Sequence, residues 1–116
     1  MIDVTIANFE TDVIEASKTT PVLVDFWAPW CGPCKTLGPL LEKVEADYGG
    51  RFILAKIDSD QEQQLAGAFG IRSIPTIALF KGGEVVDGVL GMAPQSFFHE
   101  MLDKHVPAPQ TSAAEA

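Results

Sequence analysis

The chain alternates between short apolar runs and stretches in which apolar residues recur every three or four positions. Residues 21–28, PVLVDFWA, form a nearly continuous apolar run, which is typical of a strand buried on both faces of a sheet. Residues 51–58, RFILAKID, form a second run of this kind. A weaker alternation predicts a short strand over residues 2–5. Residues 76–81 and 84–89 are separated by two glycines, which predicts a tight hairpin.

Helical spacing of apolar residues occupies the intervals between these strands. Asn8 is a candidate N-cap for the first helix, and Pro39 should kink the second. The element order β-α-β-α-β-α-β-β-α predicts an α/β fold, in which helices flank both faces of a central mixed β-sheet. The predicted helices cover residues 8–18, about 31–48, a short stretch ending near 69, and 94 to about 105.

Length and composition indicate one domain with a short extension. The 116 residues suffice for a single core, which we assign to residues 1–106. Residues 107–116 are small, polar or proline, so we expect a flexible tail or linker there. The N-terminus lacks the features of a signal peptide, and no apolar stretch approaches the roughly 18 residues that span a bilayer. We therefore expect a cytoplasmic protein.

The charge of the chain narrows the choice of partners. There are 16 acidic and 8 basic side chains, which give a formal net charge of -8. Nucleic acids and anionic membranes carry charge of the same sign, so neither is expected as the main partner.

Two cysteines, in the sequence Cys31-Gly32-Pro33-Cys34, lie where a buried strand gives way to a helix. If the helix begins near Cys31, its sulfur faces free backbone N–H groups and the positive end of the helix dipole, which favour a thiolate. Cys34 is one turn further in, where we expect it to be less exposed and able to resolve a mixed disulfide. Pro33 suits the first helical turn because no partner for its nitrogen is needed there.

Three other uses of the cysteine pair are less well supported. A structural zinc site needs four ligands, and His99 and His105 are six positions apart on one helix and so point in different directions. Covalent haem attachment needs histidine where Lys35 stands. A structural disulfide closing so short a loop would constrain little of the unfolded chain. Redox chemistry is thus the favoured interpretation, and we expect no metal site.

Asp25 is the one charged residue within the apolar run of residues 21–28. Burial there would raise its pKa and let it accept the proton of Cys34, unless it lies at a strand end facing water. Lys56 in the neighbouring run is a candidate charge partner, although an exposed lysine is the ordinary alternative. Pro75 precedes a predicted strand, and its peptide bond would be trans by default.

The motifs WCGPCK at residues 30–35, VDFWA at 24–28 and IPT at 74–76 together resemble the thioredoxin family over residues 2–106. The resemblance implies the thioredoxin fold and the reduction of protein disulfides, with Cys31 as nucleophile and Cys34 as resolving cysteine. It further implies a monomer with no bound cofactor, which receives electrons from NADPH through a flavin-containing thioredoxin reductase.

The resemblance also assigns roles to other residues. Asp25 corresponds to the family's buried acid and Lys56 to the lysine near it. Pro75 corresponds to the family's cis proline, which replaces the default expectation of a trans bond. The resemblance implies an apolar substrate-binding surface that consists of Trp30, Gly32, Ile74, Pro75 and Gly91. We add Pro33, within the cysteine motif, and Met92, which is next to Gly91 in the sequence.

The C-terminal half offers an alternative. Residues from about 52 to 107 look similar to the thioredoxin-like domain of chaperedoxins, whose second part is a tetratricopeptide-repeat region. No such repeats occur in this sequence. The chain could accordingly be the redox-competent module of a chaperone that holds unfolded clients.

Overall fold

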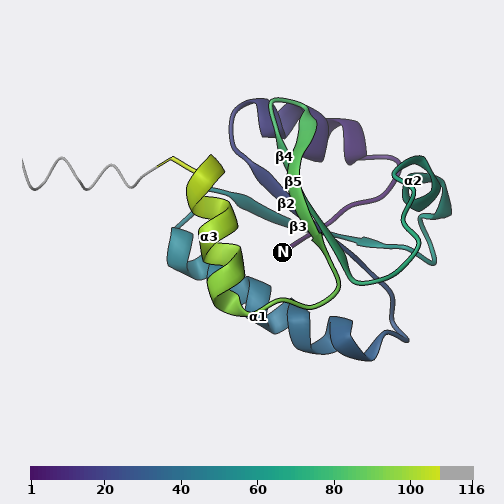
Figure 1. The fold of residues 1–116 in the computed structure, drawn as a ribbon. Coiled ribbons are helices and arrows are strands. Elements are labelled where there is room, and N and C mark those ends of the chain that lie inside the picture. The colour runs from purple at the N-terminus through teal and green to yellow at the C-terminus, as the bar shows by residue number, and fades with distance from the viewer. Residues whose placement is uncertain (108–116) are drawn as a thin grey trace, which may run out of the picture.

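The structure is a computed structural model, and it describes residues 1–107. Apart from Pro107, the predicted tail lies outside the described residues. A five-stranded sheet with strand order β1-β3-β2-β4-β5 forms the centre of the molecule (Figure 1). The strands are β1 (Ile2–Asp3), β2 (Val22–Trp27), β3 (Ile53–Asp58), β4 (Thr76–Lys81) and β5 (Glu84–Leu90).

The sheet is mixed. β1, β3 and β2 run parallel, whereas β4 pairs antiparallel with both β2 and β5. The helices are α1 (Gly32–Tyr48), α2 (Gln63–Ala68) and α3 (Gln95–His105), with the short helical turns η1 (Glu10–Glu15) and η2 (Ala16–Lys18) near the N-terminus. The predicted α/β fold, with its order of elements, is confirmed.

Helices cover both faces of the sheet, and each face has its own apolar core. α1 and α3 pack against one face, where the core includes Leu37, Leu41 and Phe98. η1 and α2 cover the opposite face, where the core includes Val13, Phe26 and Leu65 (Figure 1). β2 is buried on both faces in the centre of the sheet. The cysteine motif begins a few residues after its carboxyl end.

The N-terminal helix differs from the prediction. Residues 10–15 form a π-helix and residues 16–18 a 3₁₀-helix. Asn8 does not cap this segment, because its side-chain oxygen accepts a hydrogen bond from the backbone N–H of Thr5 at 2.6 Å. Ser17 then holds the end of the segment to the β4–β5 hairpin, since its hydroxyl accepts a hydrogen bond from the N–H of Gly83 at 2.9 Å. A local hydrogen bond at Asn8 and a contact with a distant residue at Ser17 thus accompany the departure from regular α-helical geometry.

α1 begins directly after Cys31, which is its N-cap, and continues through Pro39 to Tyr48. Gly49 ends it in the left-handed conformation with φ of 52°, which glycine adopts without steric cost. Within residues 1–107, no helix combines the length and apolarity that a membrane crossing requires.

Candidate active site

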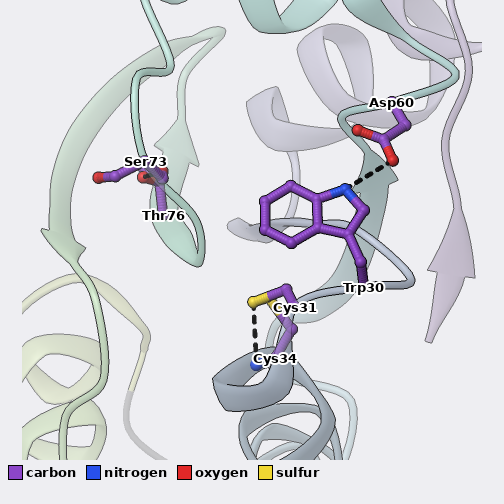
Figure 2. The surroundings of a disulfide bond; sticks show 6 residues. All are labelled: Trp30, Cys31, Cys34, Asp60, Ser73 and Thr76. Atoms are coloured by element: carbon purple, nitrogen blue, oxygen red, sulfur yellow. Dashed lines mark hydrogen bonds between the residues drawn. A yellow bond between two sulfur atoms is a disulfide. The ribbon is translucent and has the colours of Figure 1, made fainter.

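Cys31 and Cys34 form a disulfide at the N-terminus of α1, with their Cα atoms 5.3 Å apart. The sulfur of Cys31 also accepts a hydrogen bond from the backbone N–H of Cys34 at 3.2 Å (Figure 2). This N–H is one of the donors that the first turn of a helix leaves unpaired. In the reduced protein the same donor and the helix dipole favour a thiolate at Cys31.

Exposure does not distinguish the two cysteines. Cys31 is 3% exposed and Cys34 is 5% exposed, so the expectation that Cys34 would be less exposed is wrong. Their surroundings differ instead, since Cys31 caps the helix whereas Cys34 lines a pocket together with Asp25.

Asp25 lies within β2 and is 2% exposed. Its Oδ1 is buried and has no hydrogen-bond partner among the described residues. Burial raises the pKa of this carboxyl from 3.8 to about 7, and the positive charge of Lys56 limits the rise. The carboxyl is therefore poised to gain or lose a proton near neutral pH, beside Cys34.

Lys56 stands opposite Asp25 in the parallel register of β2 and β3. Its ammonium group forms its ion pair with Asp3, at 3.6 Å, and lies 5.0 Å from the centre of the Trp27 ring. Lys56 thus acts on Asp25 through the field of its charge, without an ion pair or hydrogen bond between the two side chains.

The loop before β4 approaches the disulfide from a distant part of the sequence. The Ile74–Pro75 peptide bond is cis. The carbonyl of Pro75 accepts a hydrogen bond from the N–H of Gly91 at 2.8 Å, which brings Met92 to the same region. Met92 is exposed, whereas Ile74 is half-buried and Pro75 is buried. The expected substrate surface is thus gathered from separate segments, with Gly32 and Pro33 exposed at the start of α1.

Trp30 is 69% exposed and lies beside the disulfide (Figure 2). Its indole Nε1–H donates a hydrogen bond to Asp60 at 2.8 Å, which fixes the ring orientation. Asp60 follows the end of β3, and no local pattern in the sequence indicated that it would contact Trp30. A groove of about 420 Å³ runs from Trp30 and Asp60 to Ser73 and Ile74. Thr76 supports this loop by donating a hydrogen bond to the carbonyl of Ser73.

The two histidines lie apart from the cysteines. His99 pairs with Asp47 at 3.3 Å, and His105 pairs with Asp87 at 3.1 Å. Among residues 1–107, no three side chains of the kinds that ligate metals form a cluster.

Comparison with known proteins decides what this site belongs to. The family model described as Thioredoxin matches residues 1–104. The chain belongs to the thioredoxin family. It is 46% identical to a thioredoxin of Chlorobaculum thiosulfatiphilum over 99 residues, which cover 85% of this chain and 90% of the relative. It is 43% identical to thioredoxin 1 of a Nostoc species over 103 residues, which cover 89% and 94%.

As a member of the thioredoxin family, the protein is a thiol-disulfide oxidoreductase, and Cys31 and Cys34 are its redox-active pair. The family works through this dithiol and binds no cofactor of its own. Disulfides are the substrate class, and a reductase partner is implied. The matches favour this interpretation over the chaperedoxin-type module.

Proposed function

We propose that the protein reduces disulfides of other proteins, with Cys31 as nucleophile and Cys34 as resolving cysteine. The thiolate of Cys31 attacks one sulfur of the substrate disulfide and releases the other as a thiolate, leaving a mixed disulfide. Cys34 then attacks the sulfur of Cys31, releases the second substrate thiol and closes the Cys31–Cys34 disulfide. The observation that carries this assignment is the N-cap position of Cys31, because it favours a thiolate on that sulfur alone.

Asp25 is the proposed base of the second step. A thiol attacks disulfides only after it loses its proton, and Cys34 lacks the helix-cap position that favours a thiolate at Cys31. The Asp25 carboxyl lines the same pocket as Cys34, and its pKa of about 7 leaves about half of it ionised at neutral pH. Lys56 assists by keeping that pKa from rising further.

Substrate segments are proposed to dock on the apolar surface around the disulfide. The loop carrying Ile74 and Pro75 offers backbone groups to an extended segment, and such pairing does not depend on substrate sequence. The exposed apolar side chains of Trp30 and Met92 lie at the edges of this surface. The full proposed contact set is Trp30, Gly32, Pro33, Ile74, Pro75, Gly91 and Met92.

For turnover, the disulfide of the protein must be reduced again. We assign this step to a flavin-containing thioredoxin reductase that draws electrons from NADPH. A cytoplasmic location and a monomeric state complete the proposal, since a single chain contains both cysteines and the acid.

Insulin-disulfide reduction coupled to thioredoxin reductase and NADPH tests the proposal directly. We expect NADPH consumption that depends on this protein and on both cysteines. A chain whose dithiol is intact, yet which supports no turnover with dithiothreitol or with the reductase, would overturn the assignment as a general disulfide reductase. Turnover with dithiothreitol alone would instead overturn only the choice of reductase.

A further inference from the structure

A pocket of about 230 Å³ leads from the buried carboxyl of Asp25 to the protein surface beside α1. Its inner wall includes Asp25 and Cys34, which are buried, and its outer wall includes Lys35 and Glu42, which are exposed. A water molecule occupies only about 30 Å³ in the liquid, so several fit here. Asp25 contributes to the wall of this pocket, and its buried Oδ1 has no hydrogen-bond partner among the described residues.

Gly38 presents no side chain to this pocket. It lines the pocket from the middle of α1, and a Cβ atom built on it would meet no other atom within 4 Å. Glycine is unfavourable relative to alanine inside a helix, and Pro39 beside it removes a helical hydrogen bond. Lys35, Gly38 and Glu42 follow one another at spacings of three and four residues, so they share the helix face that borders the pocket.

The charged groups around the pocket differ in their ability to accept a proton. α1 contributes Lys35 and Glu42, β3 contributes Lys56, and the α-amino group belongs to Met1. Ammonium groups have no acceptor, and Lys56 is already paired with a carboxylate of β1. Besides Asp25, Glu42 is thus the one carboxylate lining this pocket in the described part of the chain.

We propose that this pocket is the hydrated exit through which Asp25 returns its proton to solvent after each resolution step, with Glu42 receiving that proton at the mouth. This inference rests on the proposed function of Asp25. The proton of the Cys34 thiol passes to the Asp25 carboxylate as the Cys34 sulfur attacks the mixed disulfide. It then passes through pocket water to the Glu42 carboxylate and into bulk solvent. No electrons move in the relay, and both carboxylates end as they began.

The Glu42→Gln variant removes the acceptor at the mouth without closing the pocket. Stopped-flow tryptophan fluorescence at saturating disulfide substrate reports the resolution rate, because attack by Cys31 no longer limits oxidation there. We expect this rate to fall about tenfold in dilute buffer, less than the loss of a general base itself, and to be restored by added imidazole. Glu45→Gln removes the same charge from α1 outside the pocket and should leave the rate unchanged. A Glu42→Gln rate equal to that of the parent at every buffer concentration would overturn the role of Glu42.

The Gly38→Leu variant fills the pocket and tests its hydration without relying on activity. Expelling water raises the pKa of Asp25, which NMR titration of its carboxyl carbon measures directly. A rise of about one unit would lower the ionised fraction at pH 7 from about one half to about one tenth, slowing resolution about fivefold. Thr36→Leu places the same side chain on the same helix outside the pocket and is the matched control.

The two proposals fail in different ways. If Gly38→Leu leaves the titration of Asp25 unchanged, the hydrated exit is wrong even in a fully active reductase. If the parent protein does not reduce disulfides, the proposed function is wrong, while the titration still reports whether water reaches Asp25.

Discussion

Replacing Asp25 by asparagine should stabilise the fold. Asp25 is 2% exposed and its Oδ1 has no hydrogen-bond partner within residues 1–107, so the ionised form of the carboxyl is disfavoured in the folded protein. Each pKa unit corresponds to about 1.4 kcal/mol, and the rise from 3.8 to about 7 therefore corresponds to a cost of about 4 kcal/mol at neutral pH. The amide of the introduced asparagine carries no charge but still needs hydrogen bonds, so we expect Asp25→Asn to gain about 3 kcal/mol in the free energy of unfolding.

The gain should depend on pH in a defined direction. Between pH 3.8 and about 7 the unfolded chain has lost the Asp25 proton while the folded protein retains it, so stability falls as pH rises. Above pH 7 both states are ionised and this contribution is constant. The difference between Asp25→Asn and the parent should thus grow from near zero at pH 4.5 to about 3 kcal/mol at pH 7 and above, because the cost of the asparagine amide applies at every pH.

Urea unfolding of the parent and of Asp25→Asn, each with the Cys31–Cys34 disulfide formed, measures this difference at pH 4.5, 7 and 8.5. Other carboxylates contribute equally to the parent and the variant, so their effects cancel. Glu10→Gln, which removes an exposed carboxylate, is the control and should change stability little at any pH. A gain that stays constant from pH 4.5 to 8.5, or a loss of stability at pH 7, would refute the assignment of a buried, desolvated carboxyl.

Three further outcomes are expected. Cys34→Ser should trap substrates as mixed disulfides on Cys31, detectable by non-reducing electrophoresis, and equal trapping by Cys31→Ser would reverse the proposed roles. Asp60→Asn should weaken the hydrogen bond that orients Trp30, altering tryptophan fluorescence and raising KM two- to tenfold while the unfolding midpoint changes little. Gly88→Val should destabilise the fold by about 1–3 kcal/mol, because a Cβ there lies 2.6 Å from a backbone carbonyl of β4; an unchanged urea midpoint would contradict this.

The central strands β2, β3 and β4 were predictable because each combines a local apolar run with glycine, proline or charged residues at its ends. β2 illustrates this, since its near-continuous apolar sequence reflects burial on both faces. Asp25 was found by the same logic, as a charge interrupting that run. Such signals depend only on neighbouring residues along the chain, so they could be recognised without knowledge of the tertiary structure.

Features that depend on distant contacts were predicted less well. The end of the N-terminal helical segment is one example, because the hydroxyl of Ser17 accepts a hydrogen bond from the N–H of Gly83, 66 positions further along the chain. The similar burial of Cys31 and Cys34 depends on the packing of the whole fold, which no local pattern specifies. The pocket beside Asp25 is lined by residues of α1, β2 and β3 together. The sequence around Gly38 and Glu42 therefore did not indicate that these residues line a pocket.

The capping of α1 by Cys31 gives the protein a built-in reporter. The N–H of Cys34 donates to the sulfur of Cys31, so a thiolate, a thiol, a mixed disulfide and the closed disulfide each present this proton with a different acceptor. Amide chemical shifts respond to the charge and distance of their acceptor. One ¹H–¹⁵N resonance of the backbone should therefore resolve the stages of the reaction cycle in an active site that carries no substitution and no attached probe.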